Sequence, residues 1–371
     1  MTPEREPFFM PEIESADIGP IEGGAPEQIQ KRQERHERPD RLSAKILEWW
    51  KGDTHTHTKE STRPDYGYTE GIYEVEEALK YYQELGLEFA GFTEHASKPG
   101  APEIQSAASP ISQSLLREAE RITAVNREGK FETVGLSGVE ANILFDAESH
   151  PVLDLPPEVL SKLDLVIASR HAIVREKEPA AIKETLLAAI HNNNVDVIGH
   201  PDRYTRLDGQ QPDTYWEEYW GIWPEIFTAM AEAGKAFDLN MTSQPDKRIV
   251  KMAAESGVKF FLNYDAHDFN QFKWENTESW KAGDQAKNHW GKGEATDEDR
   301  ATLQAYKAER LSSGPGVKAI LRLVRWINYL EGLGVTPDRI VNSSKERLLS
   351  FLVRERGKHT LNLDQLTSPQ A

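Results

Sequence analysis

From Leu42 onward the chain alternates short apolar, β-branched runs with longer amphipathic stretches. Runs of this kind are typical of buried strands, whereas apolar positions three or four residues apart indicate helix. Seven segments fit the strand pattern: 52–58, 87–95, 131–143, 163–171, 195–202, 235–242 and 258–268. Helical patterns lie between them at 72–86, 111–129, 178–193, 223–234 and 245–257.

This alternation predicts an α/β fold with a parallel sheet and right-handed crossovers. With so many units, a closed or nearly closed β/α barrel is the expected arrangement, and an open doubly wound sheet is the alternative. After residue 268 the pattern breaks into a polar stretch containing Trp274, Trp280 and Trp290, and we predict an insertion or lid-like loop over 269–300. A helix over 316–334, a short strand at "RIVN" and a helix with capping-box spacing between Ser343 and Glu346 follow.

The first part of the chain differs from the rest in composition. Residues 1–44 are rich in Pro, Glu, Arg and Gly without a sustained period, so we predict an extended or partly ordered arm. One barrel domain is expected over 45–356, followed by a tail over 357–371. The N-terminal stretch has neither the basic segment nor the continuous apolar segment of a secretory signal peptide. No later run approaches the roughly 18 apolar residues of a membrane span. We therefore expect a cytoplasmic protein with no membrane partner.

Charge and cysteine content narrow the function. The formal net charge of −17 argues against a surface that holds a nucleic-acid backbone, which requires clustered Lys and Arg. A small substrate or a metal-rich site fits better. The chain has no cysteine, which excludes disulfides, thiolate ligands and a thiol nucleophile. Any metal must be held by nitrogen and oxygen.

Histidines and acids fall at the ends of the predicted strands, one strand after another. In β/α barrels these ends meet at one mouth. Taken singly, the His-x-His pair could be a polar strand face, the histidine of "GHP" a turn residue and the glutamate of "GVE" a solvated acid. Their joint placement favours a site that exceeds the needs of one ion, and imidazole with carboxylate suits zinc, manganese or iron. The groups are His55, His57, His95, Glu140, His171, His200, Asp265 and His267.

The motifs "DTHTHT", "GFTEHA", "SGVEANI", "ASRHAI", "IGHPDR", "DLN" and "NYDAHD" resemble, in order, those of the PHP (polymerase and histidinol phosphatase) family. The segment "RIVNSSKERLLSFL" resembles the Asn-containing C-terminal segment of its histidinol-phosphatase members. The resemblance spans roughly Ile46 to Leu352. It implies a distorted seven-stranded barrel, a TIM-like (β/α)7 fold, with a trinuclear metal site that hydrolyses phosphate esters. The eight groups match family ligands, and a ninth is expected at Asp65, with Glu60 as the alternative. The chain departs from the family in "TEH", where Asp is frequent, and in "YDAH", where Tyr264 replaces a small residue.

Two or three divalent ions would lower the pKa of bound water, so that hydroxide attacks phosphorus without a Ser or Cys nucleophile. Arg170 and Arg203 are candidates for binding the phosphoryl oxygens, with Lys98 and Arg175 as weaker ones. His267 and Glu94 are candidates for protonating the departing alkoxide.

We therefore predict a phosphatase acting on a small phosphomonoester, with L-histidinol phosphate as the best-known family substrate. A PHP-type nuclease or nucleotide phosphoesterase, a non-catalytic metal-bound assembly domain and an amidohydrolase barrel are the alternatives. The Trp-rich 269–300 stretch would be a substrate lid or a homo-oligomer contact, and Trp216, Trp220 and Trp223 would line the mouth.

Overall fold

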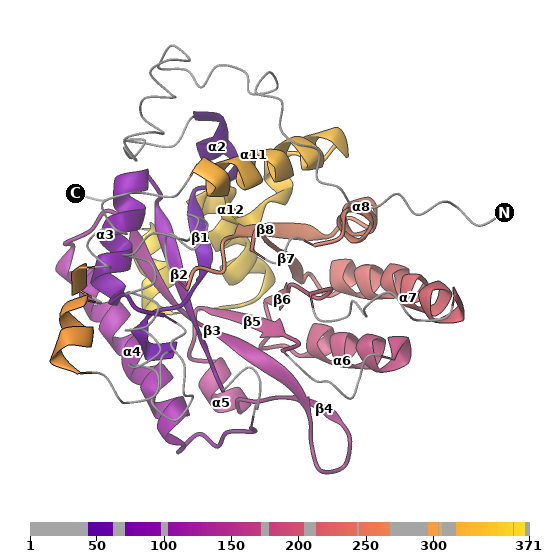
Figure 1. The fold of residues 1–371 in the computed structure, drawn as a ribbon, viewed down its shortest axis with the longest axis horizontal. Coiled ribbons are helices and arrows are strands. Elements are labelled where there is room, and N and C mark those ends of the chain that lie inside the picture. The colour runs from indigo at the N-terminus through magenta and orange to yellow at the C-terminus, as the bar shows by residue number, and fades with distance from the viewer. Residues whose placement is uncertain are drawn as a thin grey trace.

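Seven parallel strands form one sheet that curves into a nearly closed barrel (Figure 1). The computed structural model describes residues 44–61, 71–97, 103–171, 178–203, 213–242, 245–267, 296–302, 304–305, 317–358 and 360–367. In sheet order the strands are β1 (Gly52–Thr56), β2 (Phe89–His95), β3 (Val134–Phe145), β5 (Leu165–Ser169), β6 (Val197–Gly199), β7 (Ala236–Asn240) and β8 (Lys259–Asn263). Each lies inside or overlaps a segment predicted as strand, so the barrel prediction is confirmed.

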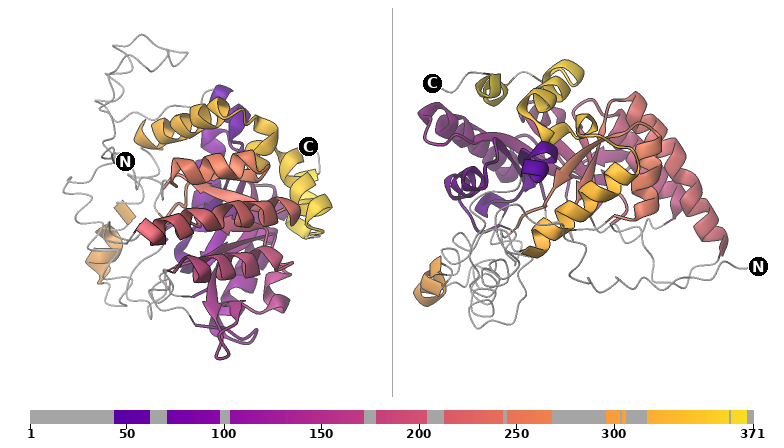
Figure 2. Two further views of the ribbon diagram at one scale, coloured as in Figure 1. Left: turned by 90° about the vertical axis from the view of Figure 1, so that its right-hand side faces the viewer. Right: turned by 90° about the horizontal axis from the view of Figure 1, so that it is seen from above.

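Helices cover the outside of this sheet, with α6, α7 and α8 stacked side by side (Figures 1 and 2). The long ones are α3 (Val75–Leu85), α4 (Pro110–Glu128), α6 (Pro179–His191), α7 (Asp213–Glu232), α8 (Lys247–Glu255) and α11 (Val317–Gly332). Ser109 caps α4 by accepting a hydrogen bond from the Ser112 amide, and Gly86 ends α3 with φ of 83°. Helix α7 starts well before the predicted 223 and runs through Pro224.

Two local predictions are wrong, and one element was not predicted. Strand β3 extends to Phe145 and turns back as β4 (Pro151–Leu153), an antiparallel hairpin that was not foreseen. "RIVN" forms 3-10 turns η3 (Pro337–Arg339) and η4 (Val341–Ser343), with one isolated bridge from Ile340 to Phe260. The cap of α12 (Lys345–Leu349) is Ser344, which accepts from the Arg347 amide, whereas the Ser343 hydroxyl donates to two carbonyls.

The remaining described elements are short. They are α2 (Ala44–Trp49), η1 (Lys59–Ser61), α5 (Pro157–Leu160), the π-helical turn η5 (Ser350–Glu355) and α13 (Leu361–Thr367). Leu363 and Leu366 of α13 are buried against the sheet, so the folded part extends past the predicted boundary at 356. The predicted arm, up to residue 43, and most of the predicted insertion, 269–295, lie outside the described residues. Among the helices that can be described, none has the length and apolar character that crossing a membrane requires.

The interior of the barrel changes character along the strands. Side chains alternate between the two faces of a strand. In β7, Phe237 and Leu239 face the outer helices, while Ala236, Asp238 and Asn240 face inward. At the start of the strands the inward residues are apolar and pack on α12, η5 and α13. At the end they are polar, so the fold confines its buried charges to one mouth.

Strands β1 and β8 close the barrel without a regular ladder. The Ala266 amide donates to the His55 carbonyl, and the His57 amide donates to the Ala266 carbonyl. Nearer the strand starts, the buried Asn342 side chain donates to the carbonyls of Gly52 and Leu262, both at 2.7 Å, and accepts from the Leu262 amide at 3.0 Å. One side-chain amide thus replaces a piece of missing strand.

Substitution Asn342→Ala should destabilise the protein by about 3 kcal/mol or more, because three buried backbone groups lose their partner and each costs about 1–3 kcal/mol. Denaturant unfolding measures the change. Asn328→Ala is the matched control, since the Asn328 amide is exposed and contacts only the Lys45 ammonium among the bonds described for it. Equal stability of the two variants would contradict the bridging role.

Candidate metal centre

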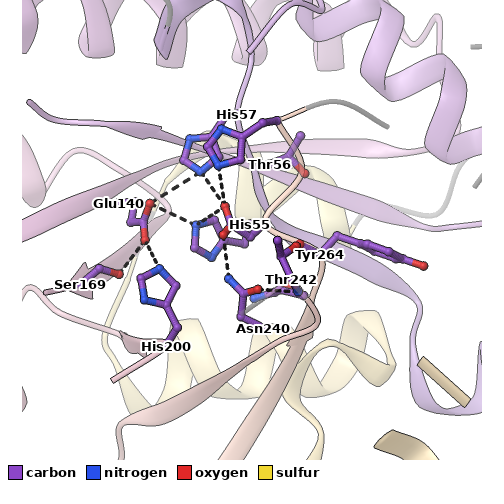
Figure 3. Close-up of polar contacts among 12 residues, drawn as sticks. His55, Thr56, His57, Glu140, Ser169, His200, Asn240, Thr242 and Tyr264 are labelled. Carbon is purple, nitrogen blue, oxygen red and sulfur yellow. Dashed lines mark hydrogen bonds and ion pairs between the residues drawn. The ribbon is translucent and has the colours of Figure 1, made fainter. Parts of the chain in front are cut away.

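The eight groups predicted from the strand ends lie together at the mouth of the barrel. Figure 3 shows His55, His57, Glu140 and His200 among them. Seven of them are at most 3% exposed, and the His267 side chain is 24% exposed. Seven of them come from the ends of five strands or the few residues that follow, and Glu140 lies in the middle of the long strand β3. Groups of three bring their ligand atoms within 4.8 Å of one another: His57, His95, His267; His55, His57, Asp265; and His95, Glu140, His171.

Glu140 is at the centre of this cluster. Its Oε2 is 3.3 Å from His55 Nε2, 3.6 Å from His57 Nε2 and 3.2 Å from His95 Nδ1. Its Oε1 is 3.1 Å from His171 Nε2 and 2.9 Å from His200 Nε2. One carboxylate therefore faces five imidazoles: Oε2 lies near three of them and Oε1 near the other two.

Ser169 supports Glu140 from the neighbouring strand β5. The Ser169 hydroxyl donates to Glu140 Oε1 at 2.7 Å. This close packing requires glycine on the next strand, because a Cβ at Gly199 would lie 2.0 Å from the Ser169 Oγ. The glycine before His200 thus has a steric role at the site.

Asp265 is the second acidic centre. Its Oδ1 is 2.9 Å from His267 Nε2 and 3.3 Å from His57 Nε2. Its Oδ2 accepts hydrogen bonds from Arg203 and from the Asn240 amide, both at 3.0 Å. Asp265 has φ of 57°, a left-handed conformation that aspartate tolerates better than most residues and that is common at functional sites.

The acids of the cluster are held in the ionised form. Burial opposes ionisation of Glu140, but His171 and His55 hold its pKa well below the usual value. Burial likewise opposes ionisation of Asp265, and His267 and His55 lower its pKa well below the usual value. Both carboxylates are therefore available as ligands over the physiological range.

The imidazoles differ from one another. Burial, together with His267 and His95, lowers the pKa of His57 well below its usual value. Burial lowers the pKa of His171 to about 4, against the opposing effect of Glu140. Burial also disfavours the charged form of His55, but Glu140 and the other nearby carboxylates raise its pKa well above the usual value.

Three of the histidines are oriented through Nδ1 by residues that are not among the predicted site residues. Nδ1 of His55 is 2.9 Å from Asp238 Oδ2, Nδ1 of His171 is 2.8 Å from Asn142 Oδ1, and Nδ1 of His57 is 3.3 Å from Ser61 Oγ. In the sequence, their only sign is that residues two apart in a strand face the same way: Asn142 follows Glu140 by two residues, and Asp238 precedes Asn240 by two. Many inward polar residues share that pattern, so it does not single these out.

The arrangement fits divalent metal ions. Nε2 of His55, Nε2 of His57 and Oε2 of Glu140 are buried and make no hydrogen bond with the part of the chain that the structure describes. Buried polar atoms without partners cost free energy unless an ion or another group satisfies them. The donors are imidazole nitrogen and carboxylate oxygen, which suit zinc, manganese or iron.

The other predicted site residues have different placements. Glu94 is fully buried beside the cluster; its Oε1 and Oε2 accept from the Thr58 amide, and Oε2 also accepts from the Ser61 hydroxyl. This position favours a role for Glu94 in holding the loop after β1, and it does not favour a role as a proton donor at the rim. Glu60 lies near Ser114 of α4, outside the described ligand groups. Asp65, Lys98 and Arg175 lie outside the described residues.

Arg203 reaches the cluster through Asp265, as described above, with its side chain 30% exposed. Arg170 is 7% exposed and close enough to Tyr215 of α7 to affect the pKa of that phenol, which burial and Glu178 raise.

The aromatic residues near the site belong mainly to the core. Trp223 is fully buried and stacks on Phe227, and Trp216 and Trp220 pack partly buried against the same core. The ring of Tyr264 points away from the histidines and packs 5.3 Å from the ring of Trp50 (Figure 3). The substitution of a small residue by Tyr264 therefore changes the barrel wall and leaves the cluster itself unobstructed.

Comparison with known proteins gives probable phosphatases and a DNA polymerase/exonuclease. No protein-family model matches the chain. A probable phosphatase of Thermoanaerobacter sp. (strain X514) is 32% identical over 231 residues, 58% of this chain and 78% of that protein. The DNA polymerase/3′-5′ exonuclease PolX of Bacillus subtilis is 28% identical over 222 residues, 59% of this chain and 34% of that protein. The structure of histidinol phosphate phosphatase from Lactococcus lactis, complexed with zinc, L-histidinol and phosphate, is 20% identical, with a TM-score of 0.39 over 69% of this chain and 93% of that chain.

Zinc added to metal-free protein should raise its stability by about 2.7 kcal/mol at a free concentration 100 times the dissociation constant. Glu140→Gln should weaken zinc binding by more than about 100-fold, because it removes the central charge, whereas Ser169→Ala should cost about tenfold through lost orientation. Calorimetric titration measures the zinc affinity of the wild type and of the two variants. Wild-type affinity in Glu140→Gln would contradict the central position of this carboxylate.

His171 should contribute a loss of stability to the metal-free protein as the pH falls from about 7 to about 4. The pKa of His171 in the fold, about 4, is below its unfolded value of about 6.5, so the unfolded chain binds the proton first. The difference amounts to at most about 3 kcal/mol, present in full above pH 6.5 and lost towards pH 4. Denaturant unfolding across this range should show a shallower slope for His171→Asn. His191→Asn, at the exposed end of α6, is the control, and an unchanged slope in His171→Asn would contradict the assignment.

Proposed function

The chain belongs to the PHP (polymerase and histidinol phosphatase) domain family, and on that basis we propose that it is a metal-dependent phosphatase acting on a small phosphomonoester. The observation that carries the proposal is the buried Glu140 facing five imidazoles at the mouth of the barrel. A purely structural role would not explain so many buried, ionisable groups converging on one point. The curated relatives covered over most of their length are probable phosphatases, which agrees with this chemistry.

The histidines with Glu140 and Asp265 would hold two or three divalent ions. Bound there, such ions lower the pKa of water to about 7 and neutralise charge on a phosphoryl group. Each acid faces several imidazoles with one oxygen, as a shared ligand requires. Ser169, Arg203 and Asn240 fix the orientation of the two acids, which keeps the ligand atoms in place without substrate.

Arg203 is our candidate for binding the phosphoryl oxygens. Its guanidinium lies beside Asp265 and is partly exposed, so it combines proximity to the cluster with access to solvent. A guanidinium matches phosphate oxygens in a bidentate way that an ammonium does not. Arg170 remains a second candidate, placed at the end of β5 next to His171.

His267 is our candidate for donating a proton to the departing alkoxide. It is the most exposed of the eight groups, and its Nε2 is 2.9 Å from an Asp265 oxygen. A donor at the rim can exchange its proton with water between turnovers. His267 is also in a ligand group, so either role depends on how many ions are bound.

A nuclease or nucleotide phosphoesterase is the second candidate, favoured by the similarity to the PolX protein. The net charge of −17 weighs against long nucleic acid and favours a small substrate, for which L-histidinol phosphate is the first to test.

Metal-loaded protein should release phosphate from at least one member of a panel containing histidinol phosphate, sugar phosphates and nucleotides, whereas cleavage of a short single-stranded DNA into nucleotides would favour the nuclease. Arg203→Met should lower kcat/KM by about 10²–10³-fold, and Arg203→Lys should recover only part of this. Arg248→Met is the control, because that guanidinium stacks on Trp220 of α7, a residue of the outer core. Full metal loading without release from any substrate would overturn the proposal in favour of an assembly role.

A further inference from the structure

Strand β7 supplies no residue to the eight-membered cluster, yet it places a carboxylate directly behind it. Asp238 and His55 are both fully buried, and Asp238 Oδ2 is 2.9 Å from His55 Nδ1. The other oxygen, Asp238 Oδ1, accepts from Asn263 Nδ2 at 2.8 Å. Asp238 therefore links β1 to β8 at the point where the barrel closes.

The orientation of this chain of bonds follows from a backbone group. The Thr54 amide and hydroxyl both donate to Asn263 Oδ1 at 2.9 Å. A backbone N–H can only donate, so the Asn263 oxygen must be the atom that faces Thr54 and its amino group must face Asp238. An ionised Asp238 can only accept, so His55 carries its proton on Nδ1. Nε2 is then the nitrogen that faces Glu140 and Asp265, 3.3 and 3.7 Å away, and it would be the donor to a metal ion once its own proton is released.

His171 and His57 have neutral partners at Nδ1 where His55 has a carboxylate. Nδ1 of His171 contacts the neutral amide oxygen of Asn142, whose amino group is held by Asp154 and Ser97. Nδ1 of His57 contacts the neutral hydroxyl of Ser61. A carboxylate behind an imidazole raises its basicity as a ligand more than a neutral acceptor does.

We propose that Asp238 is a positioning residue that makes His55 a stronger imidazole donor than His57 or His171, so that the group His55, His57 and Asp265 takes up the first metal ion, before the group His95, Glu140 and His171. The inference rests on the proposed function in taking the cluster as a metal centre. Asp265 supports the same order, because Arg203 and Asn240 already hold its outer oxygen and little reorganisation is needed.

The test is a stepwise titration of metal-free protein with Zn²⁺ against a competing chelator. Asp238→Asn should weaken the tightest step by about 10–100-fold, the effect typical of a residue that supports a metal ligand, and change later steps by less than about threefold. An unchanged first step, or equal weakening of all steps, would overturn the proposal.

A double variant separates charge from hydrogen bonding. In Asp238→Asn with Asn263→Asp, every bond from Thr54 to His55 can be made again, but the carboxylate is one residue further from the imidazole. Thermal stability should return towards that of the wild type, and this variant serves if Asp238→Asn alone fails to fold. The first step should stay weak, and recovery of wild-type affinity would show that the charge is not required and overturn the proposal.

Asn142→Ala is the matched comparison, because it removes the neutral acceptor behind His171. It should weaken a later step and leave the first within about threefold. Weakening of the first step instead would overturn the assigned order. Zinc binding is measured without substrate, so ordered binding without phosphate release would refute the proposed function and leave this inference standing.

Discussion

The buried carboxylate of Glu140 is the constraint on which the rest of the site depends. An ionised group in a barrel interior is costly unless charges and hydrogen bonds compensate it, and here five imidazoles and the Ser169 hydroxyl surround it. Removing one of these partners would leave the buried charge of Glu140 less well compensated. The same reasoning explains why the polar residues gather at one end of the strands while the other end is filled with apolar side chains from α12, η5 and α13. The fold thus isolates a charged mouth from an apolar base.

The closure of the barrel and the construction of the site are one structural problem. Strands β1 and β8 are joined by side chains and two backbone bonds in place of a ladder. Asn342 joins them near the strand starts, and Asn263 joins them through Thr54 nearer the site. His55 is in β1, His57 follows it directly, and the turn after β8 carries Asp265, so the side chains that hold the seam also set the separation of these ligands. A residue some 290 positions from β1 therefore contributes to the geometry of the site.

Much of this arrangement could be predicted, for a physical reason. Parallel strands alternating with helices bring all strand ends to one face, so His95, His171 and His200 could be placed together from their positions alone. Glu94 shows the limit of such reasoning: one residue before His95, it faces the opposite way, towards Thr58 and Ser61. Asn342 shows another limit, because "RIVN" has the composition of a strand and its asparagine acts as a replacement for one.

The sequence by itself determined the order of strands and helices, the face on which each inward residue lies, and hence the membership of the eight-residue cluster, because these depend on local period and chain order. Tertiary structure alone decided that Glu140 is central, that Asp238 lies behind His55, and that His55 turns Nε2 toward the cluster. Those features depend on contacts between strands distant in the chain, such as β1 with β7, and on distances of a few ångströms. A period of two specifies a direction for a side chain; only packing specifies what it meets.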